Sequence, residues 1–143
     1  MIQVVNNRRL VRELVLQALY AHEFTHDPPE QLIEILKEYN IIQRNMESYF
    51  RELLTKSITH QEDTKSEIIQ RLHNWKWERV ALVDRIILKM MVTEMKYMED
   101  VPLKVSITEG VEIAKKYSTE ESGAFVNGIL DSMYHSLVHH EGS

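Results

Sequence analysis

Three arginines lie close together near the N-terminus and are followed by an aromatic residue. Arg8, Arg9 and Arg12 precede Tyr20 in the sequence. Guanidinium groups neutralise phosphates, and both guanidinium planes and tyrosine rings stack on the unpaired bases of single-stranded RNA. These residue types therefore favour a contact to RNA, with the arginines on phosphates and Tyr20 on a base. The alternatives are a solvated, charged helix end for the arginines and a half-buried core position for Tyr20.

The element that must position these residues is a helix. Apolar residues recur at spacings of three and four and form one broad arc: Leu10, Val11, Leu14, Val15, Ala18 and Leu19. Asn6 or Asn7 can act as the N-cap, because a short carboxamide accepts a hydrogen bond from a free backbone N–H. The arginines then lie at the positive end of the helix dipole, which disfavours cations by a few tenths of a kcal/mol. A phosphate that binds both the arginines and the free amides would offset this cost.

Other groups of residues could also do chemistry, but each has a simpler explanation. Trp75, Lys76 and Trp77 imitate a basic and aromatic RNA motif, although a tryptophan that leads into an apolar helix more often anchors packing. His135 and His139 stand four apart, a spacing that suits a metal, but no carboxylate completes a recognised motif. No nucleophile, general acid or phosphate loop stands out. We therefore expect no enzyme activity, no metal and no cofactor.

Composition restricts the class of protein. The chain has 143 residues, 43% of them hydrophobic, and no cysteine, so we expect a single globular domain without disulfides in a reducing cytoplasm. No signal peptide or membrane-spanning segment is expected. Three arginines and one glutamate give residues 1–20 a charge of +2. Since the whole chain carries a net charge of −5, the remaining residues carry −7. Any RNA contact must therefore be local, and the N-terminal stretch is the only basic place to look for it.

The remaining sequence predicts helix after helix and no strand, because most apolar spacings are three or four. Polar residues 60–64 are expected to form a loop, and Gly128 inside the last helix suggests close approach of another backbone or a ligand. Ser106 with Glu109, and Ser118 with Glu121, resemble capping boxes that start the last two helices. We expect an all-α fold of about seven helices in two subdomains, residues 1–74 and 75–143. The expected helices span about residues 7–23, 29–39, 42–59, 65–73, 82–98, 106–117 and 119–137.

Three blocks of residues match a known family in order and spacing. The first runs from Arg8 to Tyr20, and the second from Trp75 to Pro102 with Arg79, Asp84, Arg85, Leu88 and Glu94 in it. The third and most specific comprises Glu109, residues 111–117, Ser122 and residues 125–131. Over nearly its whole length the chain resembles the NusB family of bacterial transcription antitermination factors. It departs from the family at Leu10, where a further arginine is frequent, at Gly110, where alanine is usual, and in residues 21–74, which match only in pattern.

The resemblance implies an all-helical fold and a non-enzymatic role. Family members bind the boxA element of nascent ribosomal RNA through an arginine-rich N-terminal arm. They do so together with the ribosomal protein NusE, and the complex helps RNA polymerase resist termination. The resemblance therefore implies single-stranded boxA RNA, NusE and the RNA polymerase antitermination complex as partners. A helical interaction or oligomerisation module without RNA binding, such as a homodimer that hides the arm, is the alternative.

The resemblance also suggests which residues would make these contacts. Arg8, Arg9, Arg12 and Tyr20 are the expected RNA-binding residues, and an extension of the RNA or partner surface reaches the start of the last helix. The residues of that extension are Glu121, Phe125 and Asn127. For the protein partner we expect charged residues on the exposed side of the helix that follows Trp77. These are Asp84, Lys89 and Glu94.

Overall fold

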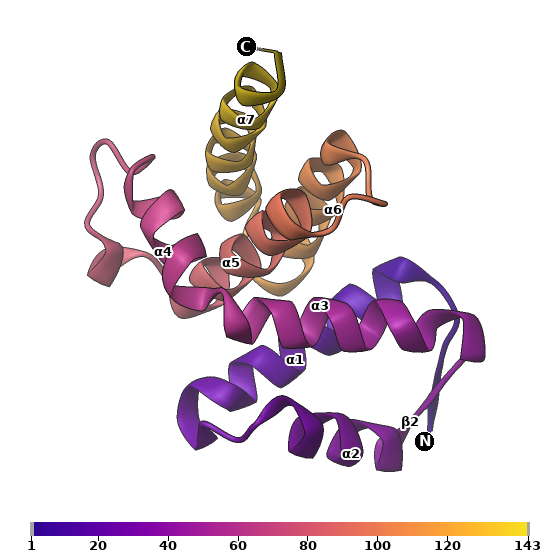
Figure 1. Ribbon diagram of the computed structural model, residues 1–143. Coiled ribbons are helices and arrows are strands. Elements are labelled where there is room, and N and C mark those ends of the chain that lie inside the picture. Colours follow the sequence, from indigo (N-terminus) through magenta and orange to yellow (C-terminus); the bar gives the residue numbers. More distant parts are fainter. Residues whose placement is uncertain (1, 143) are drawn as a thin grey trace. The chain divides into compact units, whose positions relative to one another are not determined.

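A computed structural model of the chain describes residues 2–142, with side chains described for residues 2–139. The described residues form seven α-helices, which confirms the expected all-α class (Figure 1). The chain divides into two compact units, Met1–Thr59 (unit 1) and His60–Ser143 (unit 2). The sequence placed the boundary near residue 74, but the segment after Thr59 packs with the later helices. We therefore describe each unit by itself.

Unit 1 is built from three helices around one apolar core. These are α1 (Arg8–Thr25), α2 (Pro29–Tyr39) and α3 (Glu47–Thr59), with a short 3-10 turn, Arg44–Met46, before α3. Pro29 occupies the first turn of α2, where a missing N–H costs nothing. The buried faces of the three helices pack together, and their largest contributions come from Val11, Leu14, Val15, Leu32, Ile33, Phe50, Leu53 and Leu54.

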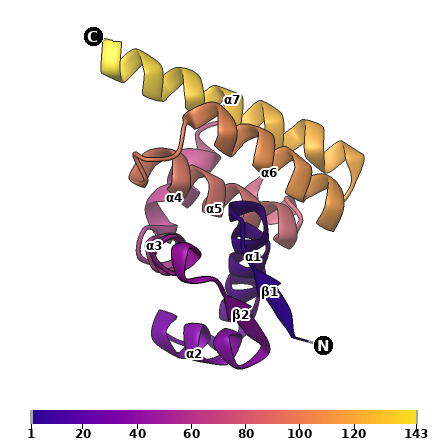
Figure 2. The ribbon, with the colours of Figure 1, turned by 90° about the vertical axis from the view of Figure 1, so that its right-hand side faces the viewer.

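Two short parallel strands, which the sequence did not predict, hold the N-terminal residues of unit 1. β1 (Gln3–Val5) pairs with β2 (Asn40–Ile42), with Val4 opposite Ile41 (Figure 2). Val5 is fully buried, and its carbonyl accepts a hydrogen bond from the backbone N–H of Gln43 at 2.9 Å. Three residues are too few to show the alternation that marks a strand. The pairing fixes the chain immediately before α1.

Unit 2 packs four helices: α4 (Gln61–Ile69), α5 (Leu82–Tyr97), α6 (Leu103–Tyr117) and α7 (Glu120–Gly142). A 3-10 turn, Trp77–Arg79, leads into α5. α7 lies along α6, and both pack against α5 (Figure 2). The expected loop at residues 60–64 is wrong, because α4 begins at Gln61. This helix packs against α5. The methionines of α5 fill the core, since Met90, Met91 and Met95 are buried.

The helix starts differ in part from those that the sequence predicts. Asn7 caps α1 as expected, because its side chain accepts a hydrogen bond from the Leu10 N–H at 2.9 Å. The capping box at Ser106 is wrong, because α6 already begins at Leu103, after Pro102. At α7 the cap is Thr119, whose hydroxyl oxygen accepts a hydrogen bond from the Ser122 N–H at 3.0 Å. Pro102 and Thr119, and not the serines of the expected capping boxes, thus precede the first residues of α6 and α7.

The glycines also correct one expectation. A Cβ at Gly128 would meet nothing within 4 Å, so no described part of the chain approaches it closely. Two other glycines lie at tight contacts, since a Cβ at Gly110 would lie 2.9 Å from Cδ1 of Leu130 and a Cβ at Gly123 would lie 2.8 Å from Cγ of Lys115. No helix of the described residues is long and apolar enough to cross a membrane.

Candidate nucleic-acid interface

The start of α1 presents positive charge at a capped helix end. With Asn7 as the cap, Arg8 and Arg9 occupy the first turn, which contains no acidic residue. The side chain of Arg9 is exposed and that of Arg8 is half-buried. Free backbone N–H groups at a helix start and guanidinium groups both attract anions. This end of unit 1 can therefore bind a phosphate.

An aromatic ring from α3 supports these arginines. The guanidinium carbon of Arg8 lies 4.6 Å from the ring centroid of Tyr49, and that of Arg12 lies 5.5 Å from it. Tyr49 itself is buried. A cation over an aromatic face is attracted by the ring quadrupole while its charge is kept. Tyr49 thus connects α3 to the arginines of α1.

Arg12 differs from its two neighbours in exposure. Only 1% of its surface is accessible, so its guanidinium does not face solvent as the expected phosphate contact requires. The reason is helical spacing, since Arg12 is one turn beyond Arg8 and enters the side of α1 that packs toward Tyr49. Arg12 therefore serves to hold the ring that Arg8 lies on.

Tyr20 is exposed and has an aromatic neighbour. Its side chain is 45% accessible and that of Phe24 is 66% accessible, and their ring centroids are 5.3 Å apart at 57°. Two exposed rings four residues apart on one helix face offer a surface on which unpaired bases can stack. The helical spacing of Phe24 from Tyr20 is the signal that could have identified it, but our prediction named Tyr20 alone.

Unit 2 contains a cleft between the segment before α5 and the start of α7. This α7 cleft has a volume of about 260 Å³. Nine residues line it: Trp75, Arg79, Val80, Ala81, Asp84, Thr119, Glu121, Ser122 and Phe125. A neighbouring cleft of about 320 Å³ shares Trp75 and Phe125 and continues along α7 past Gly128. The side chains of Trp75 and Phe125 thus line both clefts.

The α7 cleft brings together residues that the sequence considered separately. Trp75 is 59% exposed, so it is not the buried packing anchor that we favoured. Glu121 is exposed and Phe125 is half-buried, and both line this cleft, whereas Asn127 is exposed and lies outside both described linings. Trp77 is half-buried, and the guanidinium carbon of Arg85 lies 5.2 Å from the centroid of the Trp77 ring.

Comparison with known proteins decides the family of the chain. The family model described as NusB family matches residues 9–135. The chain belongs to the NusB family. It is 38% identical over 139 residues to the transcription antitermination protein NusB of Salinibacter ruber, an alignment that covers 96% of this chain and 86% of the relative. It is 35% identical over 135 residues to the protein of the same name from Chloroherpeton thalassium. That alignment covers 94% of this chain but only 64% of the relative's length.

Solved NusB structures have the same fold. The chain superposes on T. maritima NusB with a TM-score of 0.79 and 35% identity, covering 90% of each chain. It also resembles a chain in the crystal structure of the antitermination factors NusB and NusE in complex with dsRNA, with a TM-score of 0.80 and 27% identity. That match covers 90% of this chain and 96% of the other.

Two of the partner residues expected for this NusB-family chain are buried. Glu94 is fully buried and accepts a hydrogen bond from the Ser106 hydroxyl at 2.8 Å. Asp84 is 7% exposed, and its Oδ2 accepts a hydrogen bond from the Ser122 hydroxyl at 2.9 Å. The expectation that both lie on the exposed side of α5 is wrong, because hydroxyls of α6 and α7 allow α5 to bury them. Lys89 is half-buried.

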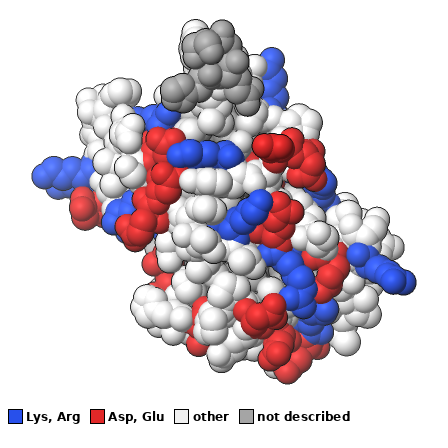
Figure 3. Space-filling model, in the orientation of Figure 1, with Lys and Arg blue, Asp and Glu red and all other residues white. Residues whose placement is uncertain are grey.

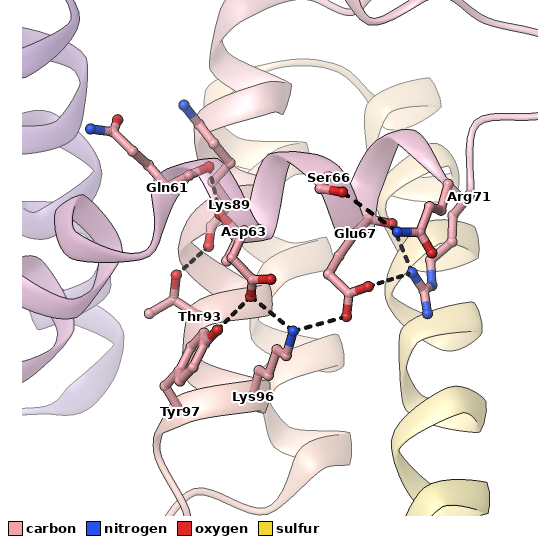
Figure 4. A network of polar contacts seen from close by, with 11 residues as sticks. Gln61, Asp63, Ser66, Glu67, Arg71, Lys89, Thr93, Lys96 and Tyr97 are labelled. Carbon is pink, nitrogen blue, oxygen red and sulfur yellow. Dashed lines mark hydrogen bonds and ion pairs between the residues drawn. The ribbon is translucent and has the colours of Figure 1, made fainter.

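A network of charged side chains joins α4 to α5 (Figure 4). The Lys96 Nζ lies 2.8 Å from Oδ2 of Asp63 and 3.2 Å from Oε2 of Glu67. Tyr97 also donates a hydrogen bond to Asp63. The hydrogen bonds from Lys96 and then Tyr97 lower the pKa of Asp63. Burial and the bond to Asp63 raise the pKa of Tyr97. This cation is held within the fold.

Opposite charges are interspersed on the face that Figure 3 shows, and no field of one sign covers it.

At the C-terminal end of α7, His135 lies 3.5 Å from Asp131, and both side chains are exposed. Among the described residues no group of three or more His, Cys, Asp or Glu side chains could hold a metal ion. Expected RNA-binding residues lie at the α1 start, which has Arg8 and Arg9, and in the α7 cleft, which has Glu121 and Phe125.

Proposed function

We propose that this NusB-family chain is a transcription antitermination factor of the bacterial cytoplasm. It binds the boxA element of nascent ribosomal RNA as a single strand, together with NusE, and helps RNA polymerase to resist termination. Two findings support the proposal. Its relatives are named transcription antitermination proteins, and a similar NusB chain has been solved with NusE and dsRNA.

The observation that carries the proposal is the geometry at the start of α1. Arg8 lies over the Tyr49 ring, and Arg9 is exposed beside it, at a capped helix end without an acidic residue. In a chain with a net charge of −5, this local cluster of arginines offers phosphates a favourable contact. Arg8 and Arg9 contact phosphates, and Arg12 contributes through Tyr49.

Other residues extend the proposed surface. Tyr20 stacks on a base, supported by Phe24 at its edge. Phe125 and Glu121 of the α7 cleft, with Asn127 on the next turn, form a second RNA or partner contact in unit 2. For NusE, the partly accessible Lys89 is the remaining candidate on α5.

Fluorescence anisotropy of labelled RNA tests the proposal. A boxA oligonucleotide and a scrambled one of the same composition are titrated with the protein, with and without NusE, at several salt concentrations. We expect tighter binding to boxA, a further gain with NusE, and a binding constant that falls as salt rises. Equal binding to the scrambled strand in the presence of NusE would contradict the proposal.

A matched pair of variants locates the contact. Arg9→Ala should weaken binding and make the salt dependence shallower by about 0.7 in log–log slope, the value for one lost phosphate contact on a single strand. Lys56→Ala is the control, because Lys56 is a cation of the same unit whose Nζ is paired to Glu52 at 2.8 Å. An equal effect of the two changes would show that net charge, and not the α1 start, attracts the RNA.

A further inference from the structure

Trp77 holds cations from two helices of unit 2. The Nζ of Lys65 in α4 lies 5.7 Å from the centroid of the Trp77 ring, and the guanidinium carbon of Arg85 in α5 lies 5.2 Å from it. All three residues are half-buried. The Arg85 Nε donates a hydrogen bond to the Val80 carbonyl at 2.8 Å, which fixes the side chain and leaves its two terminal nitrogens for another group. The ring therefore positions two cations without neutralising them.

The charges of Lys65 and Arg85 are not cancelled within the fold. Lys96, another cation of unit 2, lies 2.8 Å from a carboxylate oxygen of Asp63. Lys65 and Arg85 have no such ion pair among the residues whose side chains the structure describes. Asp84, which precedes Arg85 in the sequence, is buried and accepts a hydrogen bond elsewhere. The two cations are therefore able to attract an anion from outside the chain.

Exposed cations of the turn before α5 enlarge this basic surface. Lys76 precedes Trp77, Arg79 ends the same 3-10 turn, and both are exposed. Together with Lys65 and Arg85 they form what we call the Trp77 surface.

Two exposed carboxylates reduce the charge of the Trp77 surface but do not cancel it. Glu62 lies one turn before Lys65 in α4, and Glu78 lies in the turn with Trp77. Four cations against two carboxylates leave the surface positive, although residues 21–143 carry a charge of −7. The sequence did not show this surface, because its cations are spread over residues 65–85 among acidic residues that belong to other contacts.

The Trp77 surface suits carboxylates better than nucleotides. Sites for single-stranded RNA combine cations with open aromatic faces on which bases stack. Here the ring is half-buried and cations lie over it, so the surface offers charge without an open stacking face. A carboxylate needs no stacking, and a planar guanidinium binds it through two parallel N–H···O hydrogen bonds. The free terminal nitrogens of Arg85 offer this arrangement.

We infer that the Trp77 surface binds an acidic segment of a partner protein, with one carboxylate on Arg85 and another on Lys65. Both cations lie over the same ring, so neighbouring acidic residues of one segment reach them together. The inference goes beyond RNA binding at the α1 start and does not depend on it.

The fluorescence of Trp77 tests the inference, with octaglutamate as the probe. In the Trp75→Phe protein Trp77 is the sole tryptophan. We expect octaglutamate to change its fluorescence in a saturable way that weakens as salt rises, and octalysine to have no such effect. Lys65→Met in this background should lower the affinity for octaglutamate about fivefold, the loss for one partly exposed charge contact. Lys104→Met is the matched control, because it removes a lysine whose Nζ lies 5.7 Å from the centroid of another ring, that of Tyr134.

The other outcomes overturn the inference. With no saturable change there is no site, and an equal loss in Lys65→Met and Lys104→Met would show that only net charge acts. Tighter binding of octauridylate than of octaglutamate, weakened by Lys65→Met, would assign the surface to RNA.

A second variant tests the other cation. Arg85→Gln should also weaken octaglutamate binding, but it removes the hydrogen bond to Val80. If it fails to fold, the comparison of peptides and the Lys65→Met protein still decide, because both leave Arg85 intact. None of these measurements uses boxA RNA, so failure of the inference and failure of the proposed function are distinguishable.

Discussion

At the start of α1 the guanidinium of Arg8 lies over the ring of Tyr49, whereas in unit 2 the ammonium of Lys96 lies between the carboxylates of Asp63 and Glu67. An aromatic face positions a cation and leaves its charge in place. A carboxylate positions a cation and cancels its charge. The contact with the Tyr49 ring does not itself neutralise Arg8, whereas the two carboxylates neutralise Lys96 and join α4 to α5.

This difference shows how an acidic chain can bind an anion locally. The total charge of −5 says little about a particular site, because salt screens charges that lie more than about 8 Å apart under physiological conditions. Local charges matter more, and the first turn of α1 contains no acidic residue. We expect changes to Tyr49 to alter RNA binding, and changes to Lys96 to alter stability alone.

The largest effect is expected for Tyr49→Ala. Removing a buried aromatic side chain typically costs about 3–5 kcal/mol in the free energy of unfolding, and here it also removes the support of Arg8 and Arg12. Urea unfolding should show the loss of stability, and RNA anisotropy at a temperature where the protein stays folded should show weaker binding. Tyr49→Phe is the control, since it keeps the ring and should remain close to wild type in both measurements. A folded Tyr49→Leu protein with unchanged RNA affinity would show that the ring does not position the arginines.

A smaller effect is expected for Lys96→Met. The methionine keeps most of the apolar stem but removes the charge from between Asp63 and Glu67. Because these side chains are partly exposed, we expect a loss of about 1 kcal/mol in the free energy of unfolding. The affinity for RNA and its salt dependence should stay the same. A change in the salt slope would mean that Lys96 also contacts phosphate, and the comparison between the two cations would fail.

The helices were predictable because their signals are local. Asn7 as a cap and Pro29 as a helix start depend on residues within one turn, and the sequence identified both correctly. β1 and β2 escaped prediction because each has only three residues and its partner lies far along the chain. Local patterns thus predicted the fold class and most helix bounds, but not the pairing that fixes the chain before Arg8.

The site was less predictable because burial depends on distant partners. Asp84 and Glu94 were expected at the surface, since charged residues are rarely buried without a partner. Their partners, Ser122 and Ser106, lie on other helices, and nothing in the local sequence connects them. The same holds for Trp75 and Phe125, which share a cleft only after the helices of unit 2 have packed. The basic start of α1 was found because its charge and spacing are visible in consecutive residues.

The smallest predicted effect is the pH dependence that Asp63 gives to unit 2. Hydrogen bonds from Lys96 and Tyr97 lower its pKa below the ordinary value of 3.8, so in acid the unfolded chain binds a proton before the folded one does. The stabilisation is therefore fully present above about pH 4 and is lost as the pH falls through the lowered pKa of the folded state. Glu47 in unit 1 has a pKa lowered mainly by its bond to Lys37, so wild-type protein loses stability from both units. Urea unfolding between pH 2 and 7 should show a shallower acid loss for Asp63→Asn, and the change should be smaller in a Lys96→Met background, where the hydrogen bond from Tyr97 remains. An undiminished effect of Asp63→Asn without Lys96 would show that the lysine is not the group that lowers the pKa of Asp63.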